Sequence, residues 1–198
     1  MHEAPGSNRM AGARIALVIG VNEAPGSELH TGDKALHHAE TDARAMTQVL
    51  EACCGFQVVV PPLLGAEATS DRIKKTILRQ LGRDRRDEDF LLLYFSGHAH
   101  PMTIEADEPD VYFVTTDFDP CDVEDDPESH WSMRWLWKTL YTRTQAGKVL
   151  LILDCCYSGD MGQLGPVPTG RSCRPACSTT WEHRQPRRRR AKGGCVWR

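Results

Sequence analysis

The sequence of 198 residues has no apolar run that approaches the roughly 20 residues needed to cross a membrane, so we expect neither a membrane-spanning helix nor a membrane partner. Residues 1–13 contain no continuous apolar segment, which is the central feature of a secretory signal peptide. No internal repeat is visible either. A cytoplasmic location is the resulting expectation.

A disulfide framework is also missing, although the chain has eight cysteines. Half of them form the adjacent pairs Cys53-Cys54 and Cys155-Cys156, and neighbouring cysteines rarely bond to each other. Thiols stay reduced in the cytosol. We therefore expect free thiols rather than disulfides.

The composition is ordinary for a globular protein, with 40% hydrophobic and 26% charged residues, and the length suits one domain. The net charge of −3 conceals an asymmetry, because residues 161–198 hold nine Lys or Arg against one acidic residue. We predict a mobile leader over residues 1–12, a folded domain over residues 13–162 and a basic, disordered tail over residues 163–198. The tail could serve as a nucleic-acid arm, but a solvated tail is the favoured interpretation and nucleic acid is not an expected partner.

Short apolar runs alternate with amphipathic stretches along the folded part of the chain. The runs predict strands over residues 14–21, 56–60, 90–95, 111–116 and 149–154. Helices are predicted over residues 70–81 and 133–142, and a further helix is predicted to start after Thr31 or Asp33, to bury a stripe from Leu36 to Leu50 and to end at Gly55. This alternation predicts an α/β fold with a mostly parallel sheet and right-handed crossovers.

Two of the predicted strands stop abruptly at small, polar and reactive clusters. The run 90–95 is followed by the sequence SGH, ending at His98, and the run 149–153 is followed by DCC, ending at Cys156. Sites in open α/β sheets form beyond the carboxyl ends of the strands. A histidine and a cysteine in such places suit a thiol nucleophile and its base. The simpler interpretation is a small buried cysteine and an unrelated histidine.

These two segments resemble the histidine and cysteine motifs of the caspase-like cysteine peptidases, especially the metacaspases and bacterial caspase-domain proteins. The sequence YFSGH, from Tyr94 to His98, is similar to the histidine motif, and LDCCYSG, from Leu153 to Gly159, is similar to the cysteine motif. The animal caspase form Q-A-C-x-G is absent, so the metacaspase type fits better. The resemblance covers roughly residues 13–160, the large catalytic subunit, and implies a caspase-like three-layer sandwich with a mostly parallel sheet flanked by helices.

The resemblance implies a cysteine endopeptidase that acts on a protein or peptide through a thioester acyl-enzyme. It makes Cys156 the nucleophile and His98 the general base or thiolate partner. Cys155 falls where the family tolerates serine, so it is not expected to be catalytic. The backbone N–H groups of Ala99 and Cys156 would be the oxyanion donors.

The resemblance also implies a pocket for a basic side chain. Metacaspases line this pocket with acids, and here Asp42, Ser96 and Asp154 match its polar residues. Two converging carboxylates would favour a guanidinium or ammonium group, so cleavage after Arg or Lys is predicted. The simpler alternatives are a local hydrogen-bonding role for Asp154 and a solvated helix face for Asp42.

Calcium is the one cofactor that the resemblance raises, because several metacaspases use it. The stretches 117–119 and 124–126 are rich in carboxylates, as calcium sites require. They lack the spacing of an EF-hand, and a solvated acidic loop is the favoured interpretation.

The sequence departs from the family after the cysteine motif, where residues 163–198 offer no counterpart of the small-subunit part. We favour a truncated chain over one whose groove a partner chain completes. Two alternative functions stay open, a non-catalytic interaction module (a pseudo-peptidase) and a metal or redox site. The latter would use Cys155, Cys156, His98 and His100, or zinc ligands at Cys173, Cys177, His183 and Cys195, whose spacing is not a strong zinc pattern.

Overall fold

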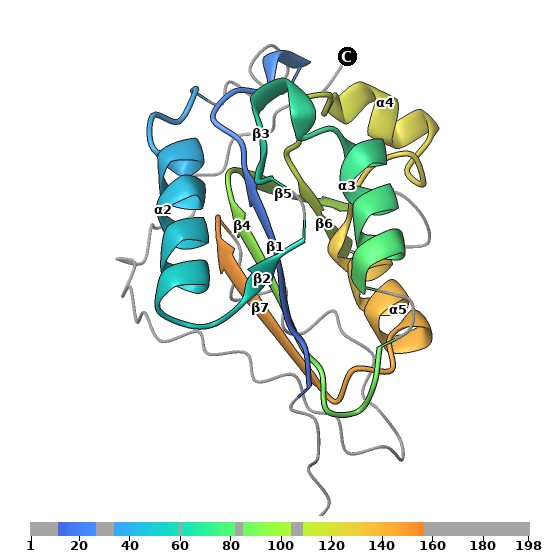
Figure 1. Cartoon of the computed structure of the whole chain (residues 1–198). Coiled ribbons are helices and arrows are strands. Elements are labelled where there is room, and N and C mark those ends of the chain that lie inside the picture. Colours follow the sequence, from blue (N-terminus) through green and yellow to red (C-terminus); the bar gives the residue numbers. More distant parts are fainter. Residues whose placement is uncertain (1–11, 27–33, 60, 82–84, 104–108, 157–198) are drawn as a thin grey trace, which may run out of the picture.

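The computed structural model describes residues 12–26, 34–59, 61–81, 85–103 and 109–156, which form a sheet between two layers of helices (Figure 1). In chain order the elements are β1 (Arg14–Gly20), α2 (Ala39–Ala52), β2 (Gln57–Val58), β3 (Leu63–Leu64), the 3₁₀ turn η1 (Gly65–Glu67), α3 (Ser70–Thr76), the π-helical turn η2 (Ile77–Leu81), β4 (Phe90–Ser96), β5 (Ala99–Thr103), β6 (Pro109–Phe113), α4 (Pro120–Asp125), α5 (Met133–Arg143) and β7 (Lys148–Asp154). Within these ranges, no helix has both the length and the apolar character that crossing a bilayer requires.

The main sheet has the strand order β2-β1-β4-β7, and every pairing in it is parallel, which confirms the predicted parallel sheet. β4 pairs with β1 and with β7 over all seven of its residues. The central strands β1 and β4 are buried on both faces, as their continuous apolar runs predict. Parallel pairing brings the carboxyl ends of β1, β4 and β7 to one edge of the sheet.

Each face of the sheet is covered by helices, with α2 on one side and α3 and α5 on the other (Figure 1). The face under α2 buries a smaller apolar cluster. The opposite face holds the larger one, in which Phe95, Phe113 and Trp131 pack ring against ring. Residues of β4 alternate between the two clusters, so successive side chains of this strand serve opposite faces.

The helix α2 begins later than predicted. It starts at Ala39, and Leu36 precedes it, so a start near residue 33 is wrong; Thr31 and Asp33 lie outside the described residues. Its N-cap residue, His38, makes no side-chain capping bond. The acceptor comes instead from the loop after β1, where Asn22 Oδ1 accepts the N–H of Glu40 at 3.2 Å. A distant cap of this kind leaves no local sequence signal.

The strand predicted over residues 56–60 is shorter than expected, because β2 covers residues 57–58, and a second short strand that was not predicted, β3, follows at residues 63–64. β2 pairs with the first half of β1, and β3 pairs with its end at Ile19 and Gly20. The sequence Pro61-Pro62 lies between the two pieces, where residues without an N–H cannot continue the ladder.

Two further elements were not predicted. β5 pairs antiparallel with β6, and β6 covers residues 109–113 rather than 111–116. The helix α4 occupies part of the predicted acidic loop, with Asp119 as its N-cap. β5 contains Pro101 and no clear apolar alternation, and α4 is a single short helix, so neither gives a strong periodic signal.

Candidate active site

The predicted reactive segments meet at the carboxyl edge of the sheet. Ser96, the last residue of β4, is paired in register with Asp154, the last residue of β7. The pairing continues beyond the strands, because the N–H of Gly97 donates to the carbonyl of Asp154 at 3.2 Å. His98 and Cys156 each lie two residues past this paired position. The structure therefore brings together the segments that carry the histidine and the cysteine.

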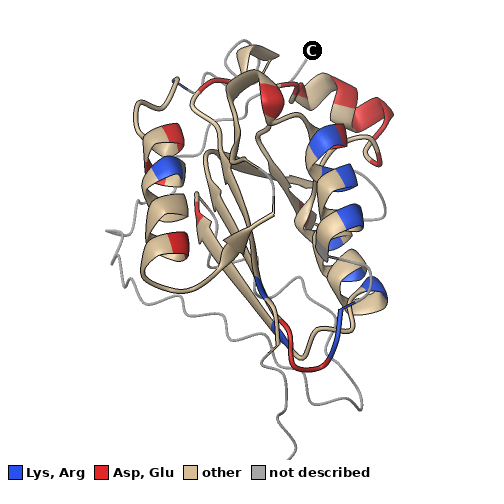
Figure 2. Cartoon of the chain, in the orientation of Figure 1, with Lys and Arg blue, Asp and Glu red and all other residues tan. Residues whose placement is uncertain are grey.

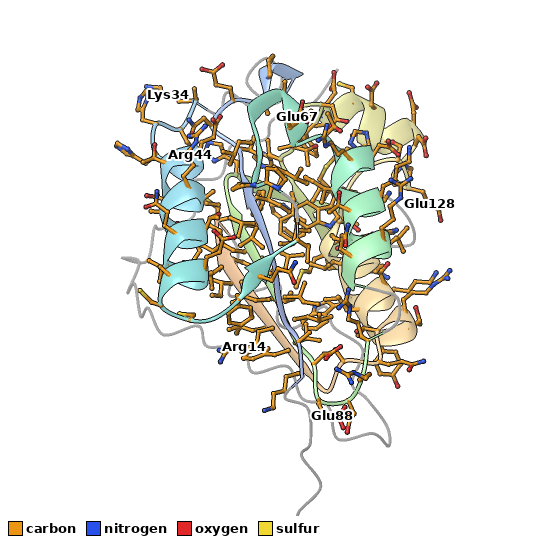
Figure 3. The ribbon with its side chains drawn as sticks, in the orientation of Figure 1. Arg14, Lys34, Arg44, Glu67, Glu88 and Glu128 are labelled. Carbon is orange, nitrogen blue, oxygen red and sulfur yellow. The ribbon has the colours of Figure 1, made fainter. Side chains whose placement is uncertain are left out.

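The imidazole of His98 is held by a backbone carbonyl. Its Nε2 lies 2.9 Å from the carbonyl oxygen of Lys34, which precedes α2 and is labelled beside the start of that helix in Figure 3. A carbonyl can only accept, so Nε2 carries the hydrogen and the neutral ring has its lone pair on Nδ1. Sequence reasoning missed Lys34, because a carbonyl contact depends on the path of the backbone and not on the side chain.

The two adjacent cysteines have different surroundings. The side chain of Cys155 packs against the larger apolar cluster, and burial, the largest effect, raises the pKa of its thiol to about 12. Cys156 is exposed. A thiolate is the nucleophilic form of cysteine, and a buried thiol with a raised pKa is inert. The geometry therefore supports Cys156 over Cys155 as the accessible nucleophile.

The hairpin of β5 and β6 sets the direction of the Ala99 N–H. In the ladder the N–H of Val114 donates to the carbonyl of His98 at 3.0 Å, so Ala99 and Phe113 form the next, non-hydrogen-bonded pair. The N–H of Phe113 accordingly points out of the hairpin and donates to Trp131. By the same rule, the N–H of Ala99 points away from β6, as an oxyanion donor would have to.

The residues predicted to line the substrate pocket come from three elements. Ser96 is buried, and its hydroxyl donates to Asp154 Oδ2 at 3.5 Å, whereas the side chain of Asp154 is exposed. Asp42 is exposed in the first turn of α2. The charges of Asp42 and Asp154 both raise the pKa of Tyr94, although burial contributes more. The negative charges of both carboxylates therefore affect the same group, Tyr94, near the carboxyl edge of the sheet.

A close approach at Gly20 brings α2 to this edge. A Cβ on Gly20 would lie 2.6 Å from the carbonyl oxygen of Ala39 and 2.8 Å from the Cβ of Ala43. The first turn of α2 therefore packs directly on the end of β1, and a larger residue would push the helix and Asp42 outward.

Comparison with known families identifies the domain. A family model described as the caspase domain matches residues 13–192. The chain belongs to the caspase-domain family. Together with the parallel sheet between helical layers, this match confirms the predicted caspase-like α/β fold.

A solved structure supports the fold of this caspase domain. The chain is similar to the crystal structure of protein GSU0716 from Geobacter sulfurreducens, at 23% identity and a TM-score of 0.56. The alignment covers 73% of this chain and 50% of the other, so the caspase domain described here spans about half of that structure. No match was found among curated proteins.

The family match runs past the residues that the structure describes. The family match extends to residue 192, beyond the boundary predicted at residue 162. Residues 157–198 lie outside the described residues, and so do the proposed zinc ligands Cys173, Cys177, His183 and Cys195. The basic tail, the missing small-subunit part and a partner chain that completes the groove stay predictions.

The acidic segment of the caspase domain uses several carboxylates in hydrogen bonds. Figure 2 shows acidic residues gathered on α4 and basic residues along α3. Asp117 Oδ1 accepts the N–H of Ser70 at 2.9 Å and the hydroxyl of Thr115 at 2.7 Å, and Asp119 Oδ1 accepts the N–H of Cys121 at 2.9 Å. Within the described ranges, no three His, Cys, Asp or Glu side chains are grouped to hold a metal ion. A calcium site stays a prediction that no described geometry supports.

A buried histidine lies against this acidic segment. His130 is 6% exposed, its ring contacts Phe118, and its Nδ1 has no hydrogen-bond partner among the described residues. Burial, the largest effect, lowers the pKa of His130. The charge of Lys74 on α3 also lowers it, while three carboxylates on and around α4 oppose the shift, namely Asp117, Asp122 and Asp126.

We expect His130 to make the caspase domain less stable in mild acid. The pKa of His130 in the folded protein lies below its ordinary value of 6.5, so the unfolded chain takes up this proton first. The free energy of unfolding should therefore fall as the pH drops below about 6.5. Urea unfolding of the wild type and of His130→Gln, at about pH 7.5 and about pH 5, should show a smaller pH dependence in the variant. The exposed His37, changed to Gln, is the control; equal pH dependence in all three proteins would contradict the prediction.

Proposed function

We propose that this chain is a cysteine endopeptidase of the metacaspase type, which cleaves peptide bonds after Arg or Lys. The observation that carries the proposal is the register of β4 and β7. It places His98 and the exposed Cys156 at equivalent positions past two paired strand ends, with the imidazole held at Nε2 by Lys34. Family membership supports a peptidase of this class, and the acids at the same edge support the basic specificity.

The proposed reaction proceeds in two steps at this edge of the sheet. The Cys156 sulfur attacks the carbonyl carbon of the scissile bond, and His98 takes the thiol proton and delivers it to the leaving amine. Water then attacks the resulting thioester, with His98 as the base, and releases the acid and the thiol. The N–H groups of Ala99 and Cys156 are the proposed donors to the oxyanion.

A substrate panel tests both parts of the proposal. Fluorogenic peptides that differ only in the residue before the reporter should be cleaved rapidly when it is Arg or Lys, much more slowly when it is citrulline, and not when it is Asp. Citrulline keeps the shape of arginine without its charge, so it isolates the electrostatic contribution of the acids. Cleavage only after Asp would refute the specificity.

The interaction-module alternative has its own outcome in this assay. The caspase domain described here covers 50% of the solved structure that it resembles, so the activity of the isolated chain has to be measured. A folded protein that cleaves no peptide of the panel would favour the non-catalytic interaction module.

A further inference from the structure

The strand β7 has the sequence of a central strand but lies at an edge of the sheet. It is last in the strand order β2-β1-β4-β7, and among the described residues β4 is its one partner strand. Its residues 149–153 form a continuous apolar run, which is typical of a strand buried on both faces. Leu151 is buried, whereas the other four residues of the run are only half-buried.

The half-buried residues of β7 lie on both faces of the sheet. Val149 and Leu153 pack against the larger apolar cluster, and Leu150 and Ile152 pack against the smaller one. Both clusters therefore end at β7 with apolar side chains that the described residues cover only in part. A further strand beside β7 would extend the sheet and cover both faces at once.

The opposite edge of the sheet has features that prevent such pairing. The strands β2 and β3, which pair with β1 there, have two residues each, and Pro61 and Pro62 lie between them. Short strands and prolines commonly protect sheet edges from other strands. The strand β7 has seven residues and no proline, and its charged residues are confined to its two ends. This contrast indicates that the edge of β7 is an interaction surface.

The backbone of β7 presents a defined set of groups at this edge. The N–H of Lys148 donates to the carbonyl of Asp89 at 3.3 Å, and the carbonyl of Asp154 accepts the N–H of Gly97 at 3.2 Å. The even-numbered residues of β7 therefore direct their N–H and C=O groups toward β4. Because these groups alternate in direction along a strand, the odd-numbered residues direct theirs to the outer edge.

The sequence of β7 is complementary to itself when two copies run antiparallel. The register that overlaps all seven residues places Leu151 on the two-fold axis and Lys148 opposite the partner's Asp154. The odd-numbered residues then exchange their N–H and C=O groups across the axis. Lys148 and Asp154 fall in non-hydrogen-bonded pairs, in which side chains approach most closely, and opposite charges there are stabilising. A parallel arrangement would place like charges side by side.

The sequence that follows β7 matches this edge less well. Residues 157–198 contain no apolar run as long as that of β7, and they are rich in proline, glycine and arginine. A strand that covers both faces of the sheet needs apolar side chains on both of its own faces. A second copy of the chain supplies such a run in β7 itself.

We propose that the outer edge of β7 binds the β7 strand of a second copy of this chain, so that the two sheets join across a two-fold axis. The same edge is used in both copies, so the contact closes at a dimer. Because the strands are antiparallel, the turn before the partner's β7 lies beside the strand end that leads to Cys156. In the dimer Asp154 pairs with the partner's Lys148, and in the monomer it is available to the proposed substrate. This inference goes beyond the proposed function and does not depend on it.

Charge reversal at the two ends of β7 tests the pairing. The molar mass of the full chain is measured by analytical ultracentrifugation over about a 100-fold range of concentration, because the stability of a dimer depends on protomer concentration. The wild type should change from monomer to dimer within this range. Lys148→Glu gives the strand two negative ends, and Asp154→Lys gives it two positive ends. Each variant alone should raise the dissociation constant of the dimer by about 10- to 100-fold.

A mixture of the two variants is the decisive measurement. A strand with two negative ends is complementary to one with two positive ends, so an equimolar mixture should dimerise at concentrations where each variant alone is monomeric. Lys148 and Asp154 of one chain are about 20 Å apart along the strand, so the recovery cannot come from a pair within one chain. Lys138→Glu, an exposed position on α5, makes the same charge change and should leave the dimer unaffected.

Each other outcome overturns the inference. A wild type that stays monomeric at every concentration shows that the edge does not bind a second copy. A dimer that both single variants retain, or a mixture that stays monomeric, places the contact elsewhere. If circular dichroism shows that Asp154→Lys does not fold, Lys148→Glu still tests the edge against Lys138→Glu. Cleavage is not measured in these experiments, so a failure of the proposed peptidase activity is a separate result.

Discussion

Replacing Cys156 with alanine is expected to lower kcat/KM for an arginine peptide by at least about 10³-fold, because no other described thiol can take its place. The adjacent Cys155 is partly buried against the larger apolar cluster, and burial raises the pKa of its thiol to about 12, so it stays protonated. Cys155→Ala should therefore change kcat/KM by only a few-fold. The pair is a matched comparison, because each variant loses one thiol at consecutive positions.

The same assay extends to the histidine. His98→Ala should lower kcat/KM by about 10²- to 10⁴-fold, the range of a lost general base. The exposed His37, changed to Ala, should have no effect, because its side chain points to solvent and is not part of the proposed catalytic pair. Full activity of Cys156→Ala, or equal losses in Cys155→Ala and Cys156→Ala, would contradict the assignment of the nucleophile. Circular dichroism shows whether each variant remains folded.

Much of the fold could be predicted from apolar runs alone. The runs that became β1, β4 and β7 are long and continuous. Burial on both faces explains β1 and β4, whereas β7, at the end of the strand order, is mostly half-buried. Shorter elements were missed where prolines or distant contacts leave no periodic pattern of apolar residues in the sequence. Pro61 and Pro62 separate the short strands β2 and β3, and Pro101 lies within β5. The start of α2 depended on Asn22, a cap from a distant loop.

The sequence predicts those parts of the candidate site that depend on the identity of a side chain. His98 and Cys156 follow apolar runs and match family motifs, so the sequence identifies both as candidates. The register that aligns Ser96 with Asp154 follows from the packing of two strands, and no local pattern encodes it. The contact between His98 and the Lys34 carbonyl could not be predicted for a different reason: every residue has a backbone carbonyl, so the sequence does not single out Lys34.

The sequence alone does not show whether Asp42 and Asp154 lie at the same edge of the sheet. Asp42 and Asp154 are distant in sequence, and either could have been a solvated surface carboxylate. Gly20 allows α2 to approach the end of β1. Burial raises the pKa of Tyr94 most, and the charges of both acids raise it further. The proposed pocket for a basic side chain would therefore depend on one close helix–strand contact as much as on the acids themselves.

Neutralising Asp154 is expected to remove most of the preference for basic substrates. Asp154→Asn keeps the size of the side chain and its hydrogen bond from Ser96, but it removes the charge that would pair with a guanidinium. A hydrogen bond to a charged group contributes about 1.5–3 kcal/mol, so kcat/KM for the arginine peptide should fall by about 10- to 100-fold. The citrulline peptide should be cleaved at the wild-type rate, which is measured in parallel.

Asp42→Asn should act in the same direction, because it removes the second charge proposed to face the basic side chain of the substrate. Glu51→Gln, near the other end of α2, removes a charge from the same helix and should change nothing. The losses should shrink in high salt for the arginine peptide only. If Asp154→Asn slows the arginine and citrulline peptides equally, the carboxylate supports the catalytic geometry and does not recognise the substrate charge. That result would leave the cysteine chemistry intact and move the source of specificity away from the strand ends.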